Sequence, residues 1–497
     1  MRKIIIKIAT VIVCTTVFVA CSDDYFDVNT PSNTATLEQL RMQDLMAPVI
    51  HSTIEAQRSA EVSFGNYVQN FVGSGGGAAG QTEASGLWSQ VYLYILPNIK
   101  AIKEKAAENN ATHIGAIADV LTAINIGIAT DTWNNIPYSE AANGPENNFP
   151  AFDSQESVYT QIFTLLDGAI AALEAPDTSG FSLGNADLIY GGGTGSSAQW
   201  LRTAYTVKAR YQLHLVQKGT VSASEVLATI ANGYTSNADD FQMFYDDKNI
   251  NPWYSAEILA RNTGNLSNDI ASQLVSSMNG DYYPFQGGTV TIDPRLPLFA
   301  EIPAADTEYK GFVSGGVGIA PDGTPANTRF KTDGYYTSVD SPITLISFAE
   351  AKFIEAEAAF LANGGTTTSV GSNTAAYTAY LAGIQASMAM YEVDGADYLA
   401  DAAIAVGETG LMLNHIMKEK YIHNFLNPET FVDYRRYNFS DDVFTGLQMR
   451  LEGADETNEF TGQWFRRANY PSTELSRNEA NVLANQQTPV TPVWWEN

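Results

Sequence analysis

Apolar residues recur at helical spacing along most of the chain. The pattern begins at Leu37 and continues to Ile54, with apolar positions three to five residues apart. Pro97 should kink or split the second predicted helix, because proline lacks the backbone N–H that an interior helical position needs. The same spacing predicts further helices over residues 87–108, 113–130, 155–174, 198–218, 223–231, 257–278, 346–363, 374–391 and 408–426.

The middle of the chain, about 280–345, breaks this pattern. Glycine, proline, aspartate and tyrosine dominate it, as in GDYYPFQGGTVTIDPRLP from Gly280. Such a composition predicts long loops with short strands. The tail from about Ala468 is loop-rich again. Neighbouring helices pair without a strict 34-residue repeat, so we predict a mostly α-helical fold of tetratricopeptide-like hairpins with a loop-rich, short-strand insertion.

The N-terminus has the pattern of a secretory signal. Basic residues precede a short apolar run from Ile8 to Val19, and Ala20 stands before Cys21. The run is about half the length that spans a bilayer. Cleavage before Cys21 would resemble a bacterial lipoprotein signal, with a plain cleaved signal or an uncleaved anchor as alternatives. We therefore predict a signal peptide over 1–20, a polar leader over 21–35 and one folded body over 36–497.

Charge and composition narrow the classes of ligand. A formal net charge of −28 disfavours nucleic acid and anionic membrane surfaces, since both would be repelled. It suits neutral ligands, cationic ligands or bound divalent ions. The 25 tyrosines carry aromatic rings with a polar tip, which suit sugar or peptide surfaces. Cys14 is the one other cysteine and lies inside the predicted signal, so the mature chain would form no disulfide.

Two sequence matches to enzyme motifs lack the context that the motifs require. Gly180–Gly184 reads G-x-S-x-G, but a turn composition precedes it where a nucleophile elbow needs a strand. Gly75–Thr82 has the glycines of a phosphate loop, with Gln81 in place of the lysine. Both segments are predicted to be loops, and no catalytic residue emerges.

Metal-binding patterns are also missing from the sequence. The five histidines form no H-E-x-x-H and have no cysteine partners, so we expect no transition metal and no cofactor. The acidic pairs Asp239-Asp240 and Asp246-Asp247 lack EF-hand spacing, and we expect them to be solvated loop acids.

A series of scattered segments, each weak as evidence by itself, follows one order along the chain. The segments are Asp131–Ala141 (DTWNNIPYSEA), Phe152–Tyr159, Asp187–Gly192, Trp200 with Lys208–Tyr211, Asp293–Leu296, Ser347–Ala351, Glu355–Ala358, Glu419–Tyr421, Asp433–Arg436, Arg466–Pro471 and Glu474. Together, from about residue 20 to 497, the chain resembles the SusD/RagB-type lipoproteins. Thr194 stands where these proteins often have aspartate, and Tyr205-Thr206 where Asn-Ser is usual.

The resemblance implies a nutrient-binding lipoprotein on the outside of the outer membrane. It implies one SusD-like unit that captures glycan, or in some members peptide, and acts as the lid of a SusC-type TonB-dependent transporter without breaking bonds. Ser22-Asp23-Asp24 resembles the acidic signal that sends Bacteroidetes lipoproteins to the cell surface. Two other classes stay open, a surface glycosidase or peptidase on the same scaffold and a structural or adhesion protein.

Several of these segments have a physical interpretation as scaffold. The segment ending Pro137-Tyr138 should end a helix, because proline disfavours helical geometry in the residue before it. Asp153 or Ser154 can cap the helix that follows. These roles are structural, with no ligand needed.

Two arginine pairs should bind carboxylates between helices. They are Arg435-Arg436 and Arg466-Arg467, and the partners we expect are acids such as Glu350 or Glu355.

Aromatic residues in or beside the loop-rich middle are the candidate ligand contacts. Stacking rings together with Asn, Gln and Asp hydrogen bonds would bind a sugar or a peptide. The candidates are Trp88, Trp253, Tyr254, Tyr282, Tyr283, Tyr335 and Tyr336.

Overall fold

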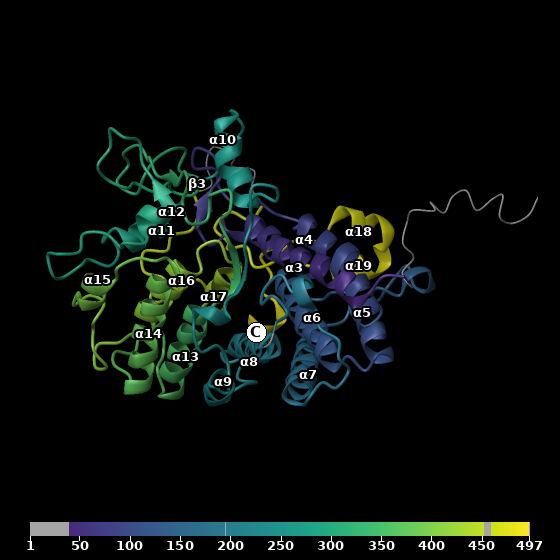
Figure 1. Cartoon of the computed structure of the whole chain (residues 1–497). Helices are drawn as coiled ribbons and strands as arrows, with labels where there is room; N and C mark the ends of the chain where they lie inside the picture. Colours follow the sequence, from purple (N-terminus) through teal and green to yellow (C-terminus); the bar gives the residue numbers. More distant parts are fainter. Residues whose placement is uncertain (1–38, 194, 452–458, 497) are drawn as a thin grey trace, which may run out of the picture.

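Consecutive helices lie side by side in one layer of the molecule. The computed structural model describes residues 39–193, 195–451 and 459–496, so the predicted signal and Cys21 lie outside the described residues. Each helix of the layer packs on the next, and α16 (Leu413–His423) packs on α13. The layer runs across the lower part of Figure 1 and consists of α6 (Thr112–Trp133), α7 (Gln155–Glu174), α8 (Ser196–His214), α9 (Ala223–Ile230), α13 (Phe348–Ala362) and α14 (Thr374–Met390).

Side-chain caps start several of these helices. Ser154, Ser347 and Asn373 precede α7, α13 and α14, and each side chain accepts a hydrogen bond from the backbone N–H three residues on. Such caps satisfy N–H groups that have no partner inside the helix. The prediction that Asp153 or Ser154 caps α7 is confirmed for Ser154.

The N-terminal helices cover α6 from its other side. α3 (Met42–Phe64) packs on α4 (Ser85–Ser89), on the π-helix η2 (Gln90–Ile95), on α5 (Leu96–Glu108) and on α6. Helical residues run without a break from Ser85 to Glu108, and the π-helix η2 gives way to α5 one residue before Pro97. Pro97 therefore coincides with a change of helix type rather than with a split of the segment.

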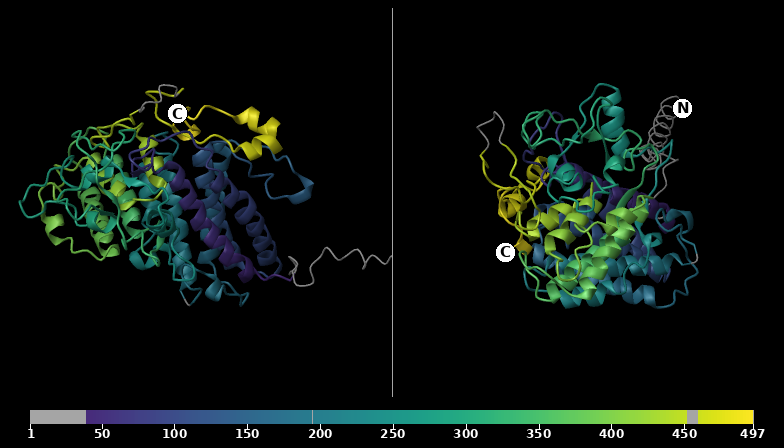
Figure 2. Two further views of the ribbon diagram at one scale, coloured as in Figure 1. Left: turned by 90° about the horizontal axis from the view of Figure 1, so that it is seen from above. Right: turned by 90° about the vertical axis from the view of Figure 1, so that its left-hand side faces the viewer.

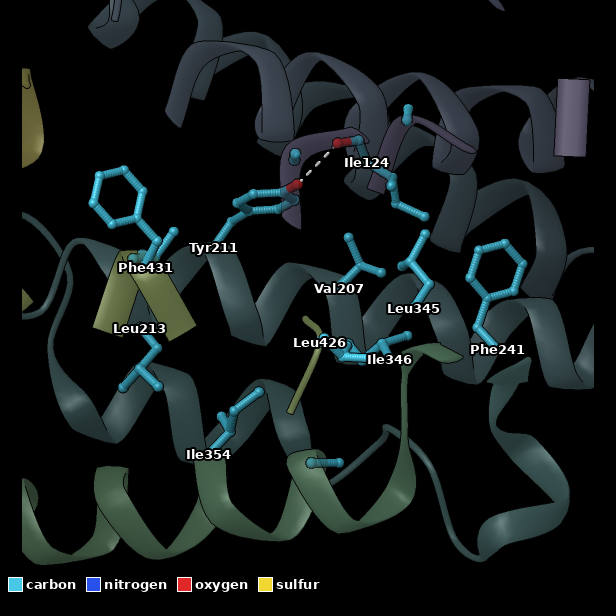
Figure 3. Packing of buried hydrophobic residues seen from close by; sticks show 14 of the residues in the cluster. Ile124, Val207, Tyr211, Leu213, Phe241, Leu345, Ile346, Ile354, Leu426 and Phe431 are labelled. Carbon is cyan, nitrogen blue, oxygen red and sulfur yellow. Dashed lines mark hydrogen bonds between the residues drawn. The ribbon is translucent and has the colours of Figure 1, made fainter. Parts of the chain in front are cut away.

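The core lies between α6, α8, α13 and the short strands (Figure 3). The Tyr211 hydroxyl of α8 donates to the Ile124 carbonyl of α6 over 3.1 Å. A Cβ at Gly127 would lie 2.0 Å from that hydroxyl, so this close crossing requires glycine. Within the described residues α6 is the one helix long and apolar enough to cross a membrane, yet 72% of its most apolar stretch is buried. It is the central core helix.

Loops and the sheet that contains β3 form the opposite side of the molecule, at the upper left of Figure 1, whereas β2 and β6 contribute to the core. One antiparallel sheet has the order β1-β3-β5-β4, and a second pairs β2 with β6. The loop-rich, short-strand composition predicted for 280–345 is confirmed. The strands are β1 (Phe71–Val72), β2 (Phe241–Met243), β3 (Asp269–Ile270), β4 (Ala300–Glu301), β5 (Arg329–Phe330) and β6 (Ile343–Ile346).

Short helices connect these parts. α18 and α19 lie at the end of the molecule away from the loops (Figure 2). The short connecting helices are η3 (Gly144–Glu146), η4 (Gly184–Ala186), η5 (Asn237–Asp239), η6 (Tyr254–Leu259), α10 (Ala260–Asn262), α11 (Ser272–Met278), α12 (Leu296–Phe299), α15 (Ala396–Ala400), α17 (Glu429–Arg436), α18 (Ser472–Arg477), α19 (Glu479–Asn485) and η7 (Trp494–Glu496).

The helix predicted over 257–278 is wrong in its middle. Gly264 has φ +78°, outside helical geometry, and the chain then enters β3 before α11 begins. The apolar residues of this range belong to two separate helical segments and a strand rather than to one helix. The tail is also more ordered than its composition suggested, since α18 and α19 fall within it.

Residues of the family-like segments pair with one another inside the scaffold. Arg210 binds Glu350 through two bonds of 2.8 and 2.6 Å. Arg295 binds both Asp293 and Glu419 at 2.6 Å. All five side chains are buried. Charged groups this deep need such partners, because burying an unpaired charge is very costly.

Candidate functional site

A cavity of about 790 Å³ opens on the loop side of the molecule. Its walls come from the end of α11, the turn after it and three later loop segments. This volume falls in the range of small-molecule sites. The lining residues are Val275, Ser276, Asn279, Asp281, Tyr282, Thr291, Ile292, Thr307, Glu308, Tyr309, Lys310, Gly311, Ala320, Pro321 and Asp322.

Two half-buried tyrosines supply the aromatic part of this cavity, Tyr282 and Tyr309. Tyr282 also packs on Gly446, where a Cβ would lie 2.5 Å from the Tyr282 Cζ. Burial raises the pKa of both hydroxyls, so they stay protonated at neutral pH. Each ring can therefore contact an apolar face while its hydroxyl donates a hydrogen bond.

Charged and amide groups supply the polar part. Lys310 donates to Asp322 at 3.1 Å and to Thr324 at 2.8 Å. Hydrogen bonds from Thr324, followed by the one from Lys310, lower the pKa of Asp322 to about 2. The Asn279 amide donates to Asp281 at 2.8 Å. The cavity thus offers mixed donors and acceptors near two rings, which suits a hydroxyl-rich ligand.

Gly311 lets the cavity wall lie directly against α11. A Cβ there would lie 2.6 Å from Ser272 Cα and 2.7 Å from the Ala271 carbonyl oxygen. The neighbouring Phe312 carbonyl accepts a hydrogen bond from the Ser272 N–H over 2.8 Å. The position of the Tyr309–Lys310 segment therefore depends on this close backbone contact.

The predicted aromatic candidates do not gather at one place. Tyr282 lines the large cavity, and Tyr335 lines a separate one. The half-buried Tyr283 has the Lys418 Nζ 5.2 Å from its ring centroid. Tyr254 is partly buried and packs against the core.

Three of the candidates are core residues instead, because their rings are covered. Trp253 is 2% exposed and packs on Phe71. Trp88 is 8% exposed and packs edge-on against Trp133. Tyr336 is 7% exposed, and no ring face of the three is free to stack on a ligand.

Sequence reasoning missed Tyr309 although it lies inside the predicted loop region. Its signal was an aromatic residue followed by Lys310-Gly311, with the glycine marking a close backbone approach. That signal is weak, because the region holds many aromatic residues and many glycines.

The segment around Pro137 and Tyr138 is scaffold. α6 ends at Trp133, and Asn134 follows with φ +76°. Asp153 accepts hydrogen bonds from the N–H groups of Tyr138 at 2.9 Å and Ser139 at 2.8 Å. It therefore holds the loop between α6 and α7.

The first arginine pair divides its roles. Arg436 binds Glu357 at 2.7 Å and also contacts Asp433. Arg435 instead donates to the backbone carbonyls of Asp131 and Arg466 at 2.7 and 2.8 Å. The prediction of a carboxylate partner is right for Arg436 and wrong for Arg435.

The second pair behaves in the same way. Arg466 pairs with Glu496, whereas Arg467 donates to the carbonyls of Thr491, at 2.9 Å, and Pro492. None of the four uses Glu350 or Glu355 in the described structure.

Glu350 pairs with Arg210, and Glu355 pairs with Lys352 at 2.7 Å. A side chain's neighbours between helices depend on crossing geometry, which the order of residues along the chain does not reveal.

Asp239 and Asp240 are buried, which corrects the expectation of solvated acids. Asp239 pairs with Arg202 at 2.6 Å. Asp240 accepts from the Phe348 N–H at 2.7 Å. They help to start α13 and to join it to α8. Asp246 and Asp247 are exposed.

Catalytic arrangements are not visible in the described part of the chain. Ser182 lies in an exposed loop without a preceding strand. Ser347 lies 2.6 Å from His423 Nε2, but both are buried and Ser347 caps α13. No three potential metal-binding side chains cluster among the described residues.

One family model matches almost the whole chain. A family model described as starch-binding and associating with the outer membrane matches residues 33–471. A search of curated proteins finds no match.

Solved structures agree with the fold. A chitin-binding SusD homolog from Flavobacterium johnsoniae has a TM-score of 0.69 at 22% identity, covering 92% of this chain and 98% of that one. A SusD/RagB family protein from Bacteroides thetaiotaomicron gives 0.66 at 20% identity, covering 92% and 99%. A putative outer membrane protein from Bacteroides vulgatus gives 0.70 at 19%, covering 92% and 100%. At these identities the likeness concerns the fold.

Proposed function

The chain belongs to the SusD-like family, and we propose on this premise that it binds a saccharide in the cavity lined by Tyr282 and Tyr309. The observation that carries the proposal is the pairing of these two rings with Lys310, Asp322 and Asn279 around about 790 Å³. Sugar rings have an apolar face and a polar edge, and this wall matches both.

The comparisons support the ligand class. The matching family is described as starch-binding, and one structural relative is described as chitin-binding. The negative net charge of the chain is compatible with a neutral glycan, because an uncharged ligand is not repelled by it. A peptide is the alternative ligand, since the same rings and amides also suit a backbone.

We extend the proposal to the setting in which the protein acts. Lipid on Cys21 would anchor it to the outer membrane, facing outward, and it would cover a SusC-type TonB-dependent transporter as a lid. The N-terminal pattern and the family membership support this setting. The chain would deliver its ligand intact, as its family membership suggests, and product analysis tests this because Asp281, Glu308 and Asp322 line the cavity.

The test is binding of the full chain, purified in detergent, to a glycan and peptide array, followed by product analysis. We expect retention of a glycan that stays uncleaved. Tyr309→Ala should weaken it about tenfold, the equivalent of about 1.4 kcal/mol, because one stacking face is lost. Tyr94→Ala is the matched control, since Tyr94 is an exposed tyrosine on η2 that does not line the cavity.

Other outcomes decide against specific parts of the proposal. Cleaved product would replace binding with hydrolysis. Retention of peptides alone would change the ligand class. Binding that survives both Tyr309→Ala and Tyr282→Ala would place the site elsewhere on the protein.

A further inference from the structure

A second cavity, of about 460 Å³, lies at the C-terminal end of α14 and shares no lining residue with the first. Its floor includes Tyr335, and the ring of Phe244 at its rim is 68% exposed. The aromatic ring of Phe244 is accessible to a ligand in the cavity.

Several oxygen atoms of this cavity are unused acceptors. The Gln242 side-chain amide donates hydrogen bonds to the hydroxyl oxygens of Tyr335 at 3.1 Å and Thr344 at 3.0 Å. Asn237 donates to the Ala386 carbonyl at 2.9 Å. Within the described residues no hydrogen bond reaches the Gln242 Oε1 or the Asn237 Oδ1. A ligand that supplies hydrogen-bond donors can therefore bind these oxygens.

Two carboxylates add negative charge, and no lysine or arginine lines the cavity. Asp240 is buried, its Oδ1 accepts from Phe348, and among the described residues no hydrogen bond reaches its Oδ2. Burial raises the pKa of Asp240 to about 7. Glu392 is exposed and forms no ion pair in the described structure. Burial together with the charges of Asp240 and Glu392 raises the pKa of the Tyr335 hydroxyl. Both acids are therefore close enough to Tyr335 to affect the same hydroxyl group.

Glu392 stands at a position where stability favours a different residue. α14 ends with the Val393 N–H bonded to the Met388 carbonyl and the Glu392 N–H to the Ala389 carbonyl, the pattern of a Schellman motif. Glu392 takes the left-handed place of this motif with φ +56°, where glycine is usual.

The negative charge of Glu392 also lies at the negative end of the dipole of a 17-residue helix, which is unfavourable. The left-handed backbone angle and the helix dipole both disfavour glutamate at this position, so the fold does not account for its presence.

We propose that this second cavity binds a protonated amine, held between Glu392, Asp240 and the C-terminal end of α14, with its attached body against Phe244 and Tyr335. Cations are attracted to aromatic faces and to helix C-termini, and the unused oxygens of Gln242, Asn237 and Asp240 are acceptors for an ammonium group. The amine can come from an amino sugar or from a lysine side chain. This inference does not rest on the saccharide site.

The test is calorimetric titration of the full chain in detergent with D-glucosamine, N-acetyl-D-glucosamine and Nα-acetyl-lysine amide. We expect glucosamine to bind and its neutral N-acetyl form to bind at least tenfold more weakly. Glu392→Gln should lower the amine affinity at least fivefold, and the exposed Glu408→Gln should leave it unchanged. Binding of the lysine amide alone would identify a peptide as the source of the amine.

Glu392→Gly separates a binding role from a structural one. It should remove amine binding and raise the melting temperature by a few degrees, because glycine fits the left-handed position. Equal affinity for glucosamine and its N-acetyl form would overturn the proposal. So would amine binding that Glu392→Gln leaves intact, or the absence of binding by both amines.

Discussion

The buried scaffold and the loops around the large cavity handle charge in opposite ways. In the scaffold, Arg210 on α8, Arg295 just before α12 and Arg436 on α17 are buried and reach carboxylates on other segments. In the loop region, Lys310 and Asp322 form a partly exposed pair between neighbouring loops. Buried pairs demand fixed partners, whereas exposed pairs contribute little and can change freely.

This difference explains where family membership is visible. The segments that resemble the family supply the buried pairs, such as Arg295 with Glu419 and Arg436 with Glu357. The residues around the proposed saccharide site belong to none of those pairs. The family is therefore readable from the scaffold, while the ligand depends on loops that the scaffold does not constrain.

The largest expected effect is on the scaffold. Arg295→Met should destabilise the protein by about 3–5 kcal/mol, because Asp293 and Glu419 lose a fully buried cation. Urea unfolding measures it. Arg329→Met in the loop region is the matched control, with an expected change under about 1 kcal/mol, since Arg329 is 43% exposed and Glu301 keeps Arg261. Equal losses of unfolding free energy in Arg295→Met and Arg329→Met would show that buried and exposed ion pairs contribute alike, contrary to the comparison.

A smaller effect concerns a scaffold acid that has no cation. Glu61 on α3 is buried, and burial raises its pKa to about 8 although Asn70 donates to it. The native state therefore keeps a proton that the unfolded state releases above about pH 4.5. The unfolding free energy should fall as pH rises from about 5 to 8.

Glu61→Gln should make that fall shallower, with the raised pKa of Asp240 accounting for part of what remains, and should leave the protein more stable than the wild type at pH 8. Urea unfolding at pH 5, 6.5 and 8 measures the slope. An unchanged slope in the variant would mean that Glu61 is ionised in the folded protein, contrary to its burial.

The smallest effect on stability tests the loop region. Gly311→Ala should cost about 1–3 kcal/mol, because the new Cβ meets the backbone of Ala271 and Ser272. It should also weaken ligand binding at Tyr309 by displacing the wall. Gly80→Ala is the control, since a Cβ there meets nothing within 4 Å. Intact binding in Gly311→Ala would show that the wall adapts.

Helices with long apolar periodicity were predictable, and the site mostly was not. α7 matches its predicted range of 155–174, because a capping serine and regular apolar spacing both act locally. The helix over 257–278 failed at Gly264, where one residue's backbone angle outweighed the pattern. Trp253 was a reasonable ligand candidate by position, and its burial against Phe71 depends on a strand far away in sequence.

Local spacing and turn chemistry along the chain were enough for the helical class and the loop-rich middle, because these depend on neighbours within a few residues. The family was recognised from the resemblance of many segments taken in order along the chain. The partners of Arg435 and Arg467, the burial of Trp88 and Trp253, and the meeting of Tyr282 with Tyr309 depend on contacts between distant segments. Those contacts follow from how helices cross and loops close, and no local pattern encodes that geometry.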